Sequence, residues 1–212
     1  AAEINGDDAR LVLFDATSVV AAGGVVDIAQ AKTIAEIAGF SDTSSSFDVT
    51  DTATDIISEA GEAGGGIIAA PFIATVKADD ATPDQAITLV DIDSVDTFAM
   101  DASSYTDLTV EQVRAVEDDK NESDASYTVL DGAAIIEGAI SDIDNADEVS
   151  SSETLTLTVA EFDALDDDDT DLMTAYDIVD DAATVAAALV AGEAAVNGAA
   201  SITTNGGSVC LA

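Results

Sequence analysis

The fold is decided by a stretch that begins Asp27-Ile28-Ala29-Gln30 and ends Phe47-Asp48-Val49-Thr50-Asp51. The same pattern runs from Thr109-Val110-Glu111-Gln112 to Tyr127-Thr128-Val129-Leu130-Asp131, and again from Thr158-Val159-Ala160-Glu161 to Tyr176-Asp177-Ile178-Val179-Asp180. Each copy opens with an Asp or Thr three residues before a Gln or Glu, which is the spacing of a helix-capping box. Each copy closes with an aromatic residue, an aliphatic residue and an Asp at alternating positions. These features predict a threefold internal repeat.

Within each copy the pattern predicts a helix, a short strand and a second helix. Apolar residues such as Ile28, Ala31 and Ile34 follow the capping box at helical spacing. In the strand that follows, alternation places the aromatic and the aliphatic side chain on one face, towards a core. The Asp that closes each copy is predicted to be the N-cap of the second helix, and these residues are Asp51, Asp131 and Asp180.

Each second helix, of which the third is very Ala-rich, leads into another segment of strand-forming residues. These segments span residues 67–76, 154–158 and 200–203. The predicted fold class is therefore α+β, with repeated units of capped helix, short strand, Ala-rich helix and strand. We expect these units to pack as one or two small α/β modules.

The first copy stands apart from the other two. Asp51 and Asp131 are 80 positions apart, but Asp131 and Asp180 only 49, and the excess falls around residues 77–106. This insert contains an apolar run, residues 86–90, that is predicted to be a strand. The prediction is an N-terminal part, residues 1–85, with strands at 10–14 and 19–20 before the first copy, and a second part, residues 86–212. The boundary falls within 77–106, and a single wrapped domain is the alternative.

The charge of the chain is extreme. There are 44 acidic and 5 basic residues in 212, which gives a formal net charge of −39 at pH 7. Repulsion on this scale opposes a compact state unless bound divalent cations, high ambient salt or assembly with trapped ions screens it. A very soluble acidic surface is the plainer alternative. Five cations are too few to bind nucleic acid or an anionic membrane surface.

The composition also argues against catalysis. The chain has no His and a single cysteine, Cys210, which excludes His-based triads, His-ligated zinc and an intrachain disulfide. Paired carboxylates serve glycosidases, but they arise by chance among 44 acids, and a chain without Trp is poorly suited to form a sugar-binding cleft. We predict that the protein is not an enzyme. No run of 18 apolar residues is present, so we expect no transmembrane segment.

The repeated pattern resembles the Ala/Asp/Thr-rich repeats of large secreted bacterial surface proteins, of the adhesin-like and surface-layer-like kinds. In those repeats a Leu-Thr-Val-Ala-Gln helix alternates with a Val-x-Asp-Thr-Ala helix and short strands. Asp51-Thr52-Ala53 matches that step, whereas Asp131-Gly132-Ala133 and Asp180-Asp181-Ala182 differ at the middle residue. The resemblance covers residues 25–76 and 107–204. It implies an extracellular structural or adhesive role and carries no active site.

Acidic loops between the two halves of each copy are the candidate metal sites. Carboxylates in flexible loops suit calcium, although the Gly and terminal Glu of an EF-hand loop are missing here. A solvated acidic loop is the alternative. The candidate calcium ligands are Asp166, Asp167, Asp168, Asp169 and Asp171 in the third copy, and Asp118, Asp119, Glu122 and Asp124 in the second. Asn121-Glu122-Ser123 is a candidate N-glycosylation sequon with Asn121 as the acceptor.

These observations favour a secreted structural protein that assembles with itself into an extracellular filament or a surface layer, aided by divalent cations. The N-terminal Ala1-Ala2-Glu3 fits a mature chain left by signal cleavage, and a fragment of a longer chain would look the same. We expect the apolar segment 11–20 to add to the sheet edge of a neighbouring copy. The alternatives are a calcium-dependent adhesin or binding module, which would contact cell-surface components, and a viral capsid or tail-decoration protein. Adaptation to high salt is compatible with each of these roles.

Overall fold

The structure is a computed structural model, and it describes residues 18–101, 105–122, 125–166 and 171–206. The chain divides into two compact units. The first comprises Ala1–Ser104 and Ala115–Ser123, and the second comprises Tyr105–Arg114 and Asp124–Ala212. The sequence prediction placed its boundary within 77–106. The predicted strand at 10–14 and most of the segment 11–20 lie outside the described residues.

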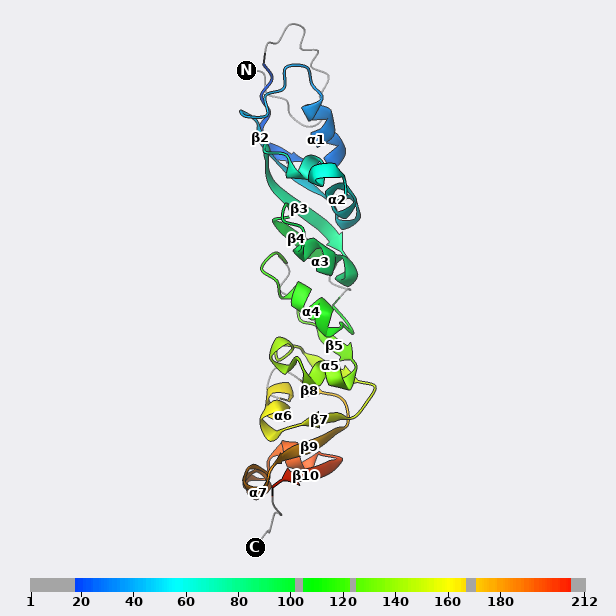
Figure 1. The fold of residues 1–212 in the computed structure, drawn as a ribbon, viewed down its shortest axis with the longest axis vertical. Helices are drawn as coiled ribbons and strands as arrows, with labels where there is room; N and C mark the ends of the chain where they lie inside the picture. The colour runs from blue at the N-terminus through cyan, green and yellow to red at the C-terminus, as the bar shows by residue number, and fades with distance from the viewer. Residues whose placement is uncertain (1–17, 102–104, 123–124, 167–170, 207–212) are drawn as a thin grey trace. The chain divides into compact units, whose positions relative to one another are not determined.

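The first unit is a parallel sheet whose strand order follows the chain. Its elements are β1 (Ala22–Val26), α1 (Ile28–Ala35), β2 (Ser46–Thr52), α2 (Ala53–Ala60), the 3-10 helices η1 (Ala63–Gly65) and η2 (Ile67–Ala69), β3 (Ile73–Ala81), α3 (Pro83–Val90) and β4 (Thr97–Met100). The strands are ordered β1-β2-β3-β4, and each neighbouring pair is parallel. Helices α1, α2 and α3 follow one another along one side of the strands (Figure 1).

The second unit contains two three-stranded parallel sheets. Its strands are β5 (Thr128–Asp131), β6 (Glu148–Ser151), β7 (Leu155–Leu157), β8 (Asp171–Leu172), β9 (Tyr176–Asp181) and β10 (Ser201–Asn205). Its helices are α5 (Ala133–Glu137), η4 (Ile140–Asp142), α6 (Val159–Leu165), α7 (Ala182–Ala191) and α8 (Ala194–Asn197), and α4 (Val110–Val116) begins in this unit. The sheets are ordered β5-β6-β8 and β10-β9-β7. The mixture of helices and parallel strands confirms the predicted α+β class.

The core includes the side chains that the alternating pattern predicted. The aromatic and aliphatic residues of the closing motifs are all buried, with exposed fractions of 8% or less, and they are Phe47, Val49, Tyr127, Val129, Tyr176 and Ile178. In the helices that follow, Ile56, Ile136 and Val185 occupy the same position relative to the helix start, and each is 0% exposed. Burial of a Val or Ile side chain contributes roughly 1.5–3 kcal/mol to folding. The strand and the second helix of each copy therefore share one apolar interior.

One predicted strand is wrong, and another begins later than predicted. The run at 86–90 is helical and belongs to α3, which begins after the N-cap Thr82. Thr82 and Gln85 form a full capping box, and Pro83 occupies the first turn, where its missing N–H costs nothing. The segment 67–76 is a 3-10 helix at its start, and its strand, β3, begins only at Ile73.

The insert that separates the first copy from the others thus contains a further strand–helix–strand segment. Thr82 begins α3 in the same way that Asp27 begins α1, and the short strand β4 continues the sheet. The excess length around residues 77–106 is therefore largely regular structure in the first unit.

Candidate functional site

Three aspartates form the same contact in the structure, and we call this contact the aspartate joint. One carboxylate oxygen, Oδ2, accepts a hydrogen bond from the first backbone N–H of the helix that precedes the aspartate in the chain. The donor–acceptor pairs are Ile28 with Asp51, Val110 with Asp131 and Val159 with Asp180, and each distance is 3.1 Å. The partners are 23, 21 and 21 residues apart, so the joint links two successive strand–helix segments.

Parallel strand pairing explains why the joint recurs. Helix α1 starts at the C-terminal end of β1, and β1 pairs with β2 in the register Val26 to Val49. Two residues beyond this pair, Ile28 begins the helix and Asp51 lies beside it at the same edge of the sheet. The other joints obey the same offset, because Leu108 pairs with Val129 and Leu157 pairs with Ile178.

The joint gives a hydrogen-bond acceptor to a backbone N–H at the helix start that would otherwise have none. The first N–H groups of a helix have no acceptor within the helix, and the helix dipole favours a negative charge there. The second carboxylate oxygen, Oδ1, accepts from the next N–H along the chain, that of Thr52, Gly132 or Asp181, at 2.9, 2.7 and 2.7 Å. Each aspartate therefore fixes both its own turn and the neighbouring helix.

The predicted N-cap role of Asp51, Asp131 and Asp180 is wrong. The N-caps of the second helices are the next residues, Thr52, Gly132 and Asp181. Thr52 accepts from the N–H of Asp55, and Asp181 accepts from the N–H groups of Ala183 and Thr184, whereas Gly132 forms no side-chain cap. The hydrogen bonds that Asp181 accepts lower its pKa, those from Thr184 most.

The predicted capping boxes are present. Asp27 and Gln30 exchange both hydrogen bonds at the start of α1, and Thr158 and Glu161 do so at the start of α6. Thr109 and Gln112 form the same pair of bonds at the start of α4. At α1, α4 and α6, therefore, both the capping box and the aspartate joint satisfy the helix start.

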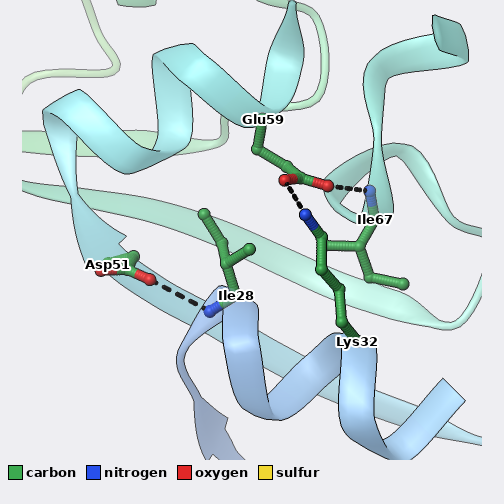
Figure 2. Close-up of polar contacts among 5 residues, drawn as sticks. All are labelled: Ile28, Lys32, Asp51, Glu59 and Ile67. Atoms are coloured by element: carbon green, nitrogen blue, oxygen red, sulfur yellow. Dashed lines mark hydrogen bonds and ion pairs between the residues drawn. The ribbon is translucent and has the colours of Figure 1, made fainter. Parts of the chain in front are cut away.

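The first joint carries an additional charged contact, shown in Figure 2. Glu59 is 5% exposed, and its carboxylate lies between α1 and the segment that follows α2. Its Oε2 pairs with the Lys32 Nζ at 2.5 Å, and its Oε1 accepts from the Ile67 N–H at 2.7 Å. Lys32 keeps half of its side chain exposed, so only the carboxylate end of the pair is buried.

These contacts shift both pKa values. Burial raises the pKa of Glu59, but the hydrogen bonds from Lys32 and Ile67 outweigh burial and leave the pKa below its usual value. The hydrogen bond to Glu59 raises the pKa of Lys32. Both shifts favour the charged pair at neutral pH.

Gly66 makes room for Glu59. Its φ of +61° lies in the region that side chains rarely adopt, and a Cβ there would lie 2.6 Å from the Glu59 backbone oxygen. The same Cβ would lie 2.3 Å from Glu59 Oε1. The Gly64-Gly65-Gly66 segment therefore includes a position, Gly66, that only glycine fits.

The described basic side chains are all engaged within the fold. Lys77 pairs with Glu122 at 2.6 Å and with Asp79 at 3.5 Å, and Arg114 pairs with Asp142 at 2.8 Å. Lys120 Nζ donates to the backbone oxygens of Val90 and Ile92. Together with Lys32, these are the four basic residues in the part of the chain that the structure describes, and Arg10 lies outside it.

The predicted calcium ligands are only partly placed by the structure. Asp167, Asp168, Asp169 and Asp124 lie outside the described residues. Asp166 follows the end of α6, and Asp171 lies in β8 with its N–H donating to the Asp147 oxygen. Asp119 is exposed on the loop after α4.

Two other predicted ligands have partners within the protein. Asp118 Oδ1 accepts from the Lys120 N–H at 2.9 Å. Glu122 pairs with Lys77, and the hydrogen bonds from Lys77 and Thr97 lower its pKa. Among the described residues, no group of three or more His, Cys, Asp or Glu side chains is arranged to hold a metal ion. The calcium site stays a prediction.

The predicted glycosylation acceptor also contacts the backbone. The Asn121 Nδ2 donates to the Val116 oxygen at 2.7 Å, and residue 121 forms a parallel bridge with Phe98. The amide nitrogen that a glycan would modify thus helps to hold the end of α4. Glycosylation at Asn121 stays a prediction.

Comparison with known proteins adds no relative. No family model, curated protein or solved structure matches this chain. None of the helices within the described ranges is long and apolar enough to cross a membrane. The function must therefore be argued from the contacts themselves.

Proposed function

We propose that the protein is an architectural subunit of an extracellular assembly, a filament or a surface layer, that forms from many copies of the chain. The aspartate joint carries this proposal. It recurs at Asp51, Asp131 and Asp180 and does one thing, which is to tie a strand to the helix before it. These repeated polar contacts hold successive strands of a parallel sheet in place. Contacts of this kind suit a structural subunit.

The distribution of charge supports the same proposal. The described basic side chains are engaged by acids or backbone oxygens of the same fold, which leaves most of the acidic residues without a cation of the protein to balance them. Exposed acidic surfaces repel one another over about 8–10 Å at physiological ionic strength. Association between copies should therefore depend on added salt or divalent cations. The extracellular location is carried over from the resemblance to secreted surface proteins.

Light scattering and electron microscopy of the purified chain test the proposal. The chain is measured at low salt with a chelator, in calcium, in magnesium, and in sodium chloride of matched ionic strength. We expect assemblies much larger than a dimer in calcium or high salt, and their loss in chelator at low salt. Equal assembly in all three salts would assign the effect to screening rather than to bound calcium. A monodisperse monomer in every condition would overturn the proposal and favour the adhesin or binding-module alternative.

A further inference from the structure

Asparagine followed by glycine is a reactive pair, and the described part of the chain contains two such pairs. They are Asn197-Gly198, at the end of α8, and Asn205-Gly206, at the end of β10, whereas Asn5-Gly6 lies outside the described residues. In such a pair the glycine nitrogen can attack the side-chain amide carbon of the asparagine, because glycine has no side chain to restrict its backbone. The reaction requires a free side-chain amide and a backbone nitrogen that no hydrogen bond holds.

The structure holds both reacting groups of the first pair. The Asn197 Nδ2 donates to the Gly192 oxygen at 2.9 Å, and the Gly198 N–H donates to the Ala194 oxygen at 3.0 Å. Gly198 also lies against Tyr176, because a Cβ added at Gly198 would lie 2.4 Å from the Tyr176 hydroxyl oxygen. The amide and the nitrogen that would attack it are therefore both engaged, and this pair must open locally before it can react.

The second pair is open. Asn205 is the last residue of β10, Gly206 is the first residue beyond the pairing with β9, and both are exposed. Within the described ranges, no residue accepts a hydrogen bond from the Gly206 N–H or bonds to the Asn205 side chain. Gly206 has a φ of +83°, and a Cβ added there would meet nothing within 4 Å. The strand fixes the Asn205 backbone, but the described contacts leave its side chain and the next nitrogen free to approach each other.

We propose that Asn205 is a site of spontaneous deamidation and that the fold protects Asn197 from the same reaction. The Gly206 nitrogen loses its proton and forms a bond to the Asn205 Cγ. The bond between Cγ and Nδ2 breaks, and the amide nitrogen leaves with a proton as ammonia. A water molecule then opens the cyclic imide at either of its carbonyl groups, which gives aspartate or isoaspartate at position 205. The inference goes beyond the proposed architectural role and does not depend on it.

The product places a new negative charge beside the N-cap of α7. Asn205 is in register with Asp181 of β9, so the two side chains lie on the same face of the sheet, on strands about 4.8 Å apart. The Asp181 carboxylate accepts from the N–H groups of Ala183 and Thr184 at 2.9 and 3.0 Å. Like charges directly opposite each other destabilise a strand pair. Deamidation should therefore loosen the end of β10 and the start of α7.

Ageing of the wild-type chain tests the assignment, with Asn197 as the internal control. The purified chain is kept in mildly alkaline buffer, with and without urea, and peptide mapping by mass spectrometry follows both sites over time. In the folded chain we expect Asn205 to deamidate at least about tenfold faster than Asn197, because only Asn197 requires local opening. In urea the two sites should react at similar rates, since each is then an Asn-Gly pair in an unfolded chain. The rate at Asn205 should rise with pH, because the Gly206 nitrogen must lose a proton.

Two results would overturn the assignment. One is an equal rate of deamidation at Asn197 and Asn205 in the folded chain. The other is a rate at Asn205 that urea accelerates as much as it accelerates the rate at Asn197, because this would show that the end of β10 protects its asparagine. As a check on the peptide assignment, Asn205→Ser should abolish the mass change at position 205 and leave the rate at Asn197 unchanged.

Two variants test the consequence for α7. Asn205→Asp carries the charge of the product, and Asn205→Ser is the matched neutral control. We expect the Thr184 N–H to exchange hydrogen faster in Asn205→Asp than in Asn205→Ser, and added salt should reduce the difference because it screens exposed charges. Circular dichroism checks that both variants remain folded. Equal exchange in the two variants would overturn the charge contact between position 205 and Asp181.

Discussion

The first and third aspartate joints have the same backbone contact but different surroundings. At both, an aspartate accepts from the first N–H of the preceding helix at 3.1 Å. Beside the first joint, Ala31 of α1 is buried, and the buried carboxylate of Glu59 pairs with the half-exposed Lys32. Beside the third joint, the equivalent of Ala31 is Phe162, whose ring lies 4.6 Å from that of Tyr176.

The equivalent of Glu59 in the third copy is Ala188, which is 2% exposed. The same position thus holds a buried carboxylate in one unit and a buried methyl group in the other. The comparison shows that the aspartate contact fixes how the helix and the neighbouring strand meet. The side chain buried behind the contact can be either charged or apolar. The stability of the two regions should therefore respond differently to substitution and to pH.

Truncation of Phe162, the aromatic side chain beside the third joint, should have the largest effect on stability. Phe162 is 3% exposed, and Phe162→Ala removes its contact with Tyr176 and leaves a cavity. We expect a loss of about 3–5 kcal/mol in the free energy of unfolding, measured by urea denaturation. Phe162→Leu, which keeps most of the volume, should lose much less. Equal losses for the two variants would show that ring packing does not stabilise this joint.

Removal of the aspartate should cost less, and by a similar amount at both joints. Asp180→Ala and Asp51→Ala each remove the acceptor of two backbone N–H groups, so we expect losses of about 2–3 kcal/mol. Hydrogen exchange of the Val159 N–H should accelerate in Asp180→Ala. Asp163→Ala, on the exposed side of α6, is the control and should change stability by less than about 0.5 kcal/mol. An unchanged Val159 exchange rate would contradict the joint.

The smallest effect, and the one that distinguishes the two interiors, concerns pH. The pKa of Glu59 is lowered in the folded state, so its contribution is present above the ordinary value of 4.5 and is lost as the pH falls below it. Glu59→Gln should reduce stability at pH 7, and the difference from the wild type should shrink as the pH falls below 4.5. The exposed Glu62→Gln is the control. A difference that stays constant across this range would show that the charge of Glu59 does not stabilise the first joint.

Local patterns in the sequence predicted a good part of this structure. The capping boxes at Asp27, Thr109 and Thr158 are short-range devices, because both partners lie within one helical turn. Burial of alternating aromatic and aliphatic residues follows from the strand period in the same way. The box at Thr82 and Gln85 had the same spacing and a Pro at the first turn, and this signal could have identified α3. The short run after it, residues 86–90, was predicted to be a strand because four apolar residues around one Thr suit both structures.

The aspartate joint could not be predicted from the same local signals. Asp51 lies two residues before a helix, so the sequence favours an N-cap role for it. In the structure the N-cap is the next residue, Thr52. The partner of Asp51 is 23 residues away, and only the register of β1 with β2 brings the Ile28 N–H to it. The pairing of Lys32 with Glu59, 27 residues apart, likewise follows from no spacing rule.

The sequence by itself therefore determined the α+β class, the starts of three helices, the core-facing side of the strands and the strong acidity of the chain. These depend on local spacing and composition, which act over a few residues or over the whole surface. The tertiary structure alone decided which helix each aspartate joins and which acid pairs with a lysine while its own carboxylate is buried. Those outcomes depend on strand register, because register brings together backbone groups that are 20 or more residues apart in the chain.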